Sequence, residues 1–276
     1  MTLSPSAVEE LLALVRRAGQ RVLAMQPSIE AEYKADGSPC TQADLEANHI
    51  ISAGLKTLTP NIPIVAEEND ADRNAEIIEQ QADYWLVDPL DVTINYMHGG
   101  KEFSINVALV QAHVPVLGVL YFPALEELYY TGADGNAYMQ RGDAVATPVQ
   151  MLPFSTKRRD RQAFSSPMVV AMRGAEGEDL PYTSKQHIQT IITAGQHRAC
   201  MVVAGKALIS SERAGFRVWD SAPTYAIVCA AGGDMRQNDG HTLCFKDKMA
   251  LPAYTVGHPS LLDRIVPPVA TDGDVI

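Results

Sequence analysis

The chain of 276 residues has few cysteines, a deficit of basic residues and no long apolar run. None of the four cysteines forms a CxxC pair, which predicts reduced, packed thiols rather than a disulfide framework. The seven histidines form no HExxH motif, which argues against a zinc hydrolase. No apolar run reaches the roughly 18–20 residues that cross a bilayer, and the first residues lack a signal-peptide pattern. We therefore expect a cytoplasmic protein with no membrane span.

The charge balance is acidic, because 33 Asp and Glu stand against 22 Lys and Arg, giving a formal net charge of −11. No basic field is available to neutralise a phosphate backbone, so we expect no nucleic-acid polymer as a partner. A small phosphorylated substrate stays compatible with this charge, because surplus carboxylates hold hard cations and a bound cation overrides local acidity. Hydrophobic residues at 46% are typical of a globular chain with a large core.

Helix and strand patterns alternate along the chain without strict βαβ repeats, and neither a GxGxxG nor a Walker A motif is present. Residues 153–163 form one basic stretch, which we interpret as a surface connection between two halves. Helices are expected at the N-terminus and at residues 44–58, 183–194 and 221–231. Strands are expected at residues 62–66, 85–87, 103–110, 116–122, 127–131 and 169–172. This order predicts an α/β (α+β) layered sandwich with mixed sheets.

The segment that carries chemistry begins with an apolar strand that runs into Asp88-Pro89-Leu90-Asp91. Two carboxylates three residues apart at a strand end can converge on one point, and the backbone carbonyl of Leu90 can join them. Carboxylate and carbonyl oxygens are the ligands that Mg²⁺ requires. An Asp-Pro sequence is also common in solvated turns, so this motif alone leaves both interpretations open.

Two further apolar segments end in acids. Glu67 and Glu68 follow residues 64–66, and Asp220 follows residues 218–219 just before an expected helix. Three acidic strand ends suit a layered fold in which ligands gather at one edge of the sheets. This pattern favours a metal site over a solvated turn.

In this order and spacing, the motifs resemble those of the Mg²⁺-dependent, lithium-sensitive phosphatase superfamily of inositol monophosphatase and 3′(2′),5′-bisphosphate nucleotidase. The family patterns are an acidic strand end, DPxDGT, and WDxA with a later AGG. They correspond here to residues 67–68, 88–93, 219–222 and 231–233. The resemblance implies a sugar-phosphatase-like α-β-α-β-α sandwich and a possible homodimer.

We expect two closely joined subdomains. The N-terminal α+β part, residues 1–150, would carry most of the metal ligands. The C-terminal α/β part, residues 151–276, would contribute Asp220 and substrate contacts.

The resemblance also implies a role for each matching acid. Glu67, Asp88 and the Leu90 carbonyl would bind one Mg²⁺. Asp88, Asp91 and Asp220 would bind a second, in a site holding two or three ions. Paired cations can activate a water, neutralise phosphoryl oxygens and stabilise the leaving alkoxide, so no covalent nucleophile is required.

The resemblance assigns the water-activating step to Asp44 and Thr93, with Glu67 as a further catalytic group. Thr93 would orient the attacking water and Asp44 would help to deprotonate it. The backbone N–H groups of Val92 and Thr93 would hold phosphate oxygens.

Three features resemble the bisphosphate nucleotidase branch. Residues 34–41 (KADGSPCT) resemble its KxDxSPVT, and residues 101–106 (KEFSIN) resemble its GEFTVN. Arg198 and Arg213 stand near basic positions of that branch, where a cation would suit a second phosphate or a sulfate. Ordinary surface charge is the other interpretation of both arginines. This branch removes the 3′-phosphate of adenosine 3′,5′-bisphosphate, giving AMP and phosphate. Residues 93–99 resemble the inositol branch instead, which leaves inositol monophosphate or another sugar phosphate as the alternative substrate.

Two departures from the family pattern affect the site. Val92 replaces the glycine of DPxDGT. If the backbone there is left-handed, valine is strained by about 1–3 kcal/mol; if it is helical, valine is allowed but its branched side chain would crowd the phosphate. Gly195 and Gln196 stand near the place of a family Gly-Ser or Gly-Thr pair. A further alternative is therefore a catalytically impaired, ligand-binding relative.

Overall fold

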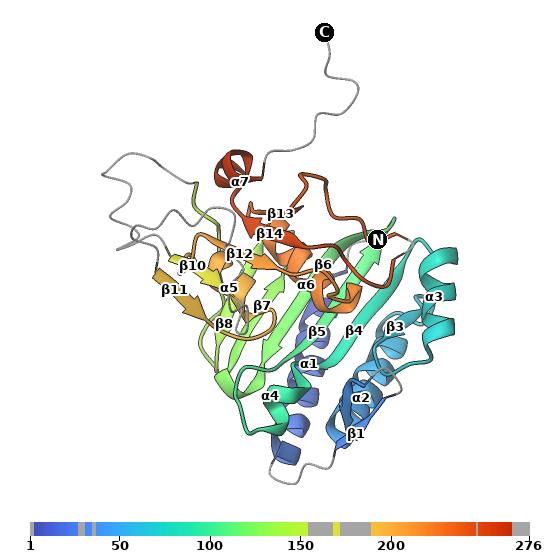
Figure 1. Ribbon diagram of the computed structural model, residues 1–276. Coiled ribbons are helices and arrows are strands. Elements are labelled where there is room, and N and C mark those ends of the chain that lie inside the picture. Colours follow the sequence, from blue (N-terminus) through green and yellow to red (C-terminus); the bar gives the residue numbers. More distant parts are fainter. Residues whose placement is uncertain are drawn as a thin grey trace.

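A sheet of seven strands forms the centre of the molecule (Figure 1). The computed structural model describes residues 3–26, 31–34, 37–153, 168–171, 189–246 and 248–266. The strands, in their spatial order, are β3 (Ile64–Ala66), β4 (Tyr84–Asp91), β5 (Ser104–Gln111), β6 (Val114–Phe122), β7 (Glu127–Thr131), β8 (Ala137–Arg141) and β9 (Thr147–Pro148). β3 and β4 are parallel, and every other neighbouring pair in this sheet is antiparallel.

The two faces of this sheet are buried against different helices. Side chains alternate between the faces along each strand, so Trp85 and Val87 pack on one side while Tyr84 and Leu86 pack on the other. The first side is covered by α1 (Pro5–Met25) and α2 (Gln42–Leu58). The second side is covered by α5 (His197–Val203) and α6 (Val218–Ala230). Because both faces are buried, each strand contains an unbroken apolar run, residues 84–87 in β4 and 107–110 in β5.

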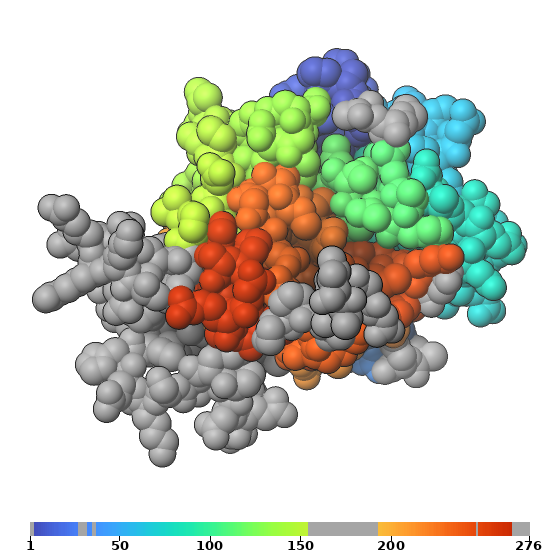
Figure 2. Space-filling view, turned by 90° about the horizontal axis from the view of Figure 1, so that it is seen from above, coloured from blue at the N-terminus to red at the C-terminus, as the bar shows by residue number. Residues whose placement is uncertain are grey.

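A second sheet of five strands lies beyond α5 and α6, which contact β12 and β13 (Figure 1). Its spatial order is β11 (Gln189–Ile192), β10 (Met168–Ala171), β12 (Ile209–Glu212), β14 (Tyr254–Gly257) and β13 (Asp234–Gln237). α7 (Pro259–Ile265) packs on β14 and β13. Viewed from above, the orange segment lies between green residues of the large sheet and the red C-terminal segment (Figure 2). The predicted α-β-α-β-α sandwich with mixed sheets is confirmed.

One close contact fixes α6 against the large sheet. A Cβ atom placed on Gly118 of β6 would lie 2.2 Å from the carbonyl oxygen of Pro223 in α6. Only glycine allows this approach of helix to strand. The contact holds α6 on the face of β4–β6, and thereby brings its first turn to the end of β4. This contact joins a residue before position 150 to one after it. The division into subdomains at residue 150 stays a prediction.

The local predictions were partly wrong. Residues 183–194 were expected to be helical, but their described part includes β11, which pairs in parallel with β10. The threonine and isoleucines of β11 favour a strand once a neighbouring strand is present. α3 (Ala71–Gln80) and the hairpin of β1 (Ala31–Tyr33) and β2 (Pro39–Thr41) were not predicted. The basic stretch lies outside the described residues, except for its first residue.

All four cysteines are free, as predicted, but only some of them are packed. Cys200 is buried, whereas Cys229 and Cys244 are exposed, so the prediction of packed thiols is wrong for those two. Within the described part of the chain, the helices are either too short or too polar to cross a membrane.

A buried polar cluster links β7 to α5. The Glu127 carboxylate accepts hydrogen bonds from His197 Nε2 at 3.2 Å and from the Arg141 guanidinium. The bond from His197, supported by Arg141, lowers the pKa of Glu127 from 4.5 to about 2, against the opposing effect of burial. An ionised Glu127 therefore stabilises the fold above its ordinary pKa, and this stabilisation is lost as the pH falls toward 2.

We expect Glu127→Gln to lower the free energy of unfolding by about 3 kcal/mol at pH 7, because His197 and Arg141 lose their charged acceptor. The difference from the wild type should shrink as the pH falls below about 4.5. Urea unfolding of both proteins between pH 7 and pH 3 measures it. Glu126→Gln, at an exposed neighbouring position, is the control. A difference that does not change with pH would contradict the ionic origin of this stabilisation.

Candidate metal centre

A β-bulge at the end of β4 brings two carboxylates to the same face. Asp88 lies opposite Asn106 of β5, and Asp91 lies opposite Ser104, so β4 advances three residues where β5 advances two. In a regular strand, residues three apart point to opposite faces. The extra residue of the bulge reverses this alternation. The predicted convergence of Asp88 and Asp91 is therefore produced by the bulge.

The third carboxylate comes from the first turn of α6. Asp220 accepts a hydrogen bond from the backbone N–H of Arg217 at 2.8 Å and so caps the helix. Carboxylate oxygens of Asp88, Asp91 and Asp220 lie within 4.8 Å of one another. The expectation that Asp220 ends a strand was wrong, because α6 already begins at Val218. The helix end, packed on the large sheet, places Asp220 beside Asp88.

Burial, together with the charges of neighbouring acids, raises the pKa values of these aspartates. Burial is the main cause for Asp88, followed by the charges of Glu67, Asp91 and Asp220. Burial also raises the pKa of Asp220, with the charge of Asp91 adding to it. The pKa of Asp91 rises to about 6 through burial, although Asn106 and the N–H of Val92 act in the other direction. A cation among these carboxylates would remove the repulsion that disfavours their charged forms.

The donor set fits a hard divalent cation. Asp91 Oδ2 is buried and has no hydrogen-bond partner among the described residues, which leaves it open to a cation. The carboxylates and the adjacent Leu90 carbonyl offer only oxygen, as Mg²⁺ and similar ions prefer. Residues fit to hold such an ion are therefore present.

Glu67 lies in the turn after β3 and reaches the same cavity as the three aspartates. Its carboxylate accepts a hydrogen bond from Lys34 Nζ at 3.1 Å, and Glu68 accepts one from the same ammonium at 2.7 Å. Burial raises the pKa of Glu67, while the Lys34 charge opposes that rise. The sequence analysis assigned no role to Lys34, although this residue begins the KADGSPCT segment. In the structure it supplies positive charge beside a predicted metal ligand.

Thr93 and Asp44 meet beside the carboxylates. Thr93 Oγ1 lies 3.3 Å from Asp44 Oδ1 and 3.0 Å from the Leu90 carbonyl oxygen, so its hydroxyl can donate to either. The other oxygen of Asp44 accepts bonds from the N–H and hydroxyl of Thr41, which fix the carboxylate at the start of α2. Burial raises the pKa of Asp44 to about 6, which suits a base working near neutral pH. The structure therefore brings together the two residues predicted to activate water.

Val92 adopts the left-handed conformation, with φ 63° and ψ 44°. Its carbonyl accepts hydrogen bonds from the N–H groups of Asn95 at 2.8 Å and Tyr96 at 3.2 Å, which start α4 (Thr93–Met97). A β-branched residue in this conformation is strained by about 1–3 kcal/mol, and such strain is found mainly at functional sites. The N–H of Val92 interacts with the Asp91 carboxylate. Phosphate binding by the N–H groups of Val92 and Thr93 stays a prediction.

The arginines are arranged differently from the sequence prediction. The Arg198 guanidinium is buried and donates to both oxygens of Glu212 and to the Thr193 carbonyl. Its contacts favour a positioning role, and substrate binding by Arg198 and by the exposed Arg213 stays a prediction. The sequence analysis missed Arg217, which lines the metal cavity. Its place two residues before Trp219 of the Trp-Asp motif was the available signal.

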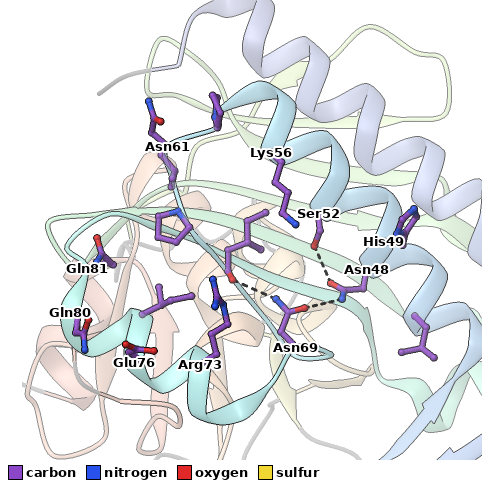
Figure 3. A pocket seen from close by; sticks show the side chains of 16 residues that line it. Asn48, His49, Ser52, Lys56, Asn61, Asn69, Arg73, Glu76, Gln80 and Gln81 are labelled. Carbon is purple, nitrogen blue, oxygen red and sulfur yellow. Dashed lines mark hydrogen bonds between the residues drawn. The ribbon is translucent and has the colours of Figure 1, made fainter.

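Two cavities of the described structure differ in chemistry. The metal cavity has a volume of about 340 Å³ and is lined by the acidic cluster together with Val92, Ile94 and Arg217. A larger one of about 740 Å³ lies between α2 and α3 (Figure 3). Its wall is a chain of hydrogen bonds from Ser52 through Asn48 and Asn69 to the Ile64 carbonyl. Glu76 is its only acidic lining residue, so the larger cavity lacks the ligands for a metal centre.

Fold and site together define a layered α/β protein with an acidic cation site between a strand end and a helix N-terminus. The chain matches the Inositol monophosphatase family over residues 6–269. It therefore belongs to the inositol monophosphatase family, whose members are metal-dependent phosphatases.

Curated relatives support this assignment along nearly the whole chain. The 3′(2′),5′-bisphosphate nucleotidase CysQ of Salmonella typhimurium is 34% identical over 256 residues, covering 90% of this chain and 98% of the relative. CysQ of Escherichia coli strain K12 is 31% identical over 257 residues, with the same 90% and 98% coverage.

Solved structures of related proteins have the same fold. CysQ from Bacteroides thetaiotaomicron superposes with a TM-score of 0.73 at 27% identity, covering 92% of this chain and 97% of the other. An inositol monophosphatase of Thermotoga maritima superposes with a TM-score of 0.69 at 22% identity, covering 92% of each chain. The second likeness shows the fold alone.

We expect Mg²⁺ to raise the melting temperature of the wild type relative to the protein in EDTA, because the ion binds the folded state only. Asp91→Asn should raise the melting temperature of the metal-free protein by removing one repelling charge, and should abolish most of the Mg²⁺ response. Differential scanning fluorimetry measures both effects.

Asp143→Asn, on an exposed turn, is the matched control and should keep the full Mg²⁺ response. A wild type that ignores Mg²⁺, or an Asp91→Asn variant that keeps the wild-type response, would show that these carboxylates do not form the metal centre.

Proposed function

We propose that this protein is a Mg²⁺-dependent phosphomonoesterase that removes the 3′-phosphate of adenosine 3′,5′-bisphosphate, giving AMP and phosphate. The observation that carries the proposal is the convergence of three carboxylates with Thr93 in one cavity, where the Thr93 hydroxyl lies 3.3 Å from the Asp44 carboxylate. The substrate is supported by the relatives named 3′(2′),5′-bisphosphate nucleotidase, 98% of whose length is matched in the two reported above.

The ligands proposed for two or three Mg²⁺ ions are Glu67, Asp88, Asp91, Asp220 and the Leu90 carbonyl. When bound, such ions lower the pKa of water and neutralise the charge of the phosphoryl oxygens. The chain itself holds these ligands in fixed positions through the bulge of β4 and the cap of α6.

The proton of the attacking water is assigned to the Thr93–Asp44 pair. Thr93 Oγ1 orients the water when its own hydrogen is donated to Asp44 Oδ1. Asp44 is held by Thr41 and has a pKa of about 6, so it is ionised at neutral pH and accepts the proton through the threonine. Glu67 is placed to act on the same water from the cavity wall.

Arg217 supplies the positive charge for the second phosphate in this proposal. It lines the metal cavity, and neither Arg198 nor Arg213 belongs to that lining. A guanidinium recognises phosphate oxygens through paired donors. This arrangement favours a bisphosphate over a substrate with a single phosphate.

Inositol monophosphate or another sugar phosphate is the second candidate substrate, favoured by the TINYMHG segment at residues 93–99. A ligand-binding relative with impaired catalysis is the third, favoured by the strained backbone of Val92. The intact Thr93–Asp44 pair favours catalysis over this third candidate. A cytoplasmic location, lithium inhibition and a homodimer are further proposals that rest on the family resemblance.

We expect Mg²⁺-dependent release of phosphate from adenosine 3′,5′-bisphosphate, faster than from inositol 1-phosphate or fructose 1,6-bisphosphate. Thr93→Ala should lower kcat by about 10²- to 10⁴-fold, because the water loses its orienting hydroxyl. Steady-state kinetics with a phosphate-release assay measure this. The Asp143→Asn variant should remain fully active. Faster turnover of a sugar phosphate would make that compound, and not the nucleotide, the proposed substrate. No phosphate release from any of the three compounds would favour the ligand-binding alternative.

We expect Arg217→Gln to raise KM for adenosine 3′,5′-bisphosphate about tenfold, the equivalent of roughly 1.4 kcal/mol, through loss of one charged contact. KM for adenosine 3′-monophosphate should change little, since that compound has no second phosphate. Arg213→Gln is the matched comparison at an exposed arginine outside the cavity lining. A selective effect of Arg213→Gln, with none from Arg217→Gln, would return the second-phosphate role to Arg213.

A further inference from the structure

The metal cavity has an apolar side that its phosphate chemistry does not explain. Val92 and Ile94 line the cavity together with the acidic ligands. Ile94 is 61% exposed, which is unusual for an isoleucine and leaves its side chain open to solvent in the absence of substrate. Both residues flank Thr93, so any substrate whose phosphate reaches Thr93 must pass close to them.

The side chain of Val92 packs against the backbone of Gly195. A Cβ atom on Gly195 would lie 2.5 Å from Val92 Cγ2 and 3.0 Å from Asp91 Oδ2. Gly195 also has φ +53°, a conformation that side-chain-bearing residues rarely adopt. The valine side chain therefore packs against the backbone of residue 195, next to the Asp91 carboxylate.

The conformation of Val92 gives no local reason for a valine. At φ 63° and ψ 44° a glycine would be free of strain, and a β-branched side chain is among the least suited. Strain that the surrounding structure maintains is evidence that the side chain itself has a role. Its two contacts, with Gly195 and with the cavity, indicate what that role is.

We propose that Val92 and Ile94, with Val92 seated on Gly195, form an apolar wall that selects substrates by the organic group beside the phosphate. A nucleobase or another apolar face gains by burial against this wall. The hydroxyls of a polyol ring lose water there without finding a hydrogen-bond partner. The wall therefore favours a nucleotide over an inositol phosphate. The inference rests on the proposed phosphatase activity and adds the basis of its substrate choice.

The test is the ratio of kcat/KM for adenosine 3′,5′-bisphosphate to kcat/KM for inositol 1-phosphate. Ile94→Gln and Val92→Ala should each lower this ratio about tenfold, as expected for the loss of a few methyl or methylene contacts. Ile94→Leu keeps an apolar side chain and should stay within twofold of the wild type. Val145→Ser, at a highly exposed site on another loop, controls for general loss of surface hydrophobicity.

If the ratio is unchanged in both Ile94→Gln and Val92→Ala, the proposed selection by the apolar wall is wrong, even if the enzyme prefers the nucleotide. A wild type that hydrolyses neither compound would overturn the proposed function, and the selection with it. The two failures are therefore separated by the activity of the wild type alone.

A second measurement tests the contact between Val92 and Gly195 by thermal stability and needs no activity assay. Gly195→Ala should lower the melting temperature more in the wild type than in the Val92→Gly background, where the clashing Cγ2 atom is absent. The double-mutant cycle removes the backbone strain that alanine introduces at residue 195 in either background. Purely additive shifts would show that Val92 and Gly195 are not in contact and would overturn this part of the inference.

Discussion

The mutual repulsion of three carboxylates is the constraint on which the rest of the site depends. Asp88, Asp91 and Asp220 are brought together in a partly buried cavity where their negative charges disfavour one another. Such an arrangement is unfavourable unless positive charge enters it. The site is thus built for a ligand that carries charge of the opposite sign, and the neighbouring Lys34 ammonium compensates only the adjacent pair of glutamates.

The fold maintains this arrangement through rigid elements rather than loops. β4 is buried on both faces between α1 and α2 on one side and α6 on the other. The bulge in β4 is held by its pairing with β5, and α6 is held by its contact with Gly118. Stability of the two apolar layers therefore opposes the electrostatic strain at their edge, as is common where a stable core supports a reactive site.

The departures from the family pattern lie on the substrate side of the site and not among the metal ligands. Val92 is strained and is accommodated by Gly195, while the Thr93–Asp44 contact next to it is intact. Val92 therefore bears on the proposed substrate pocket, while the Thr93–Asp44 contact that catalysis would use is kept.

Local patterns in the sequence were enough to predict the family, the layered fold class and the acids of the candidate metal centre. These patterns are apolar strand runs, their acidic ends and short motifs. Tertiary structure decided which residues surround these acids. Contacts between distant segments produce four features of the site: the bulge that aligns Asp91, the helical position of Asp220, the ion pair of buried Arg198 with Glu212 and the place of Arg217 in the cavity lining. The strand β11 likewise exists because β10 pairs with it. Such contacts leave no periodic signal in the residues that make them.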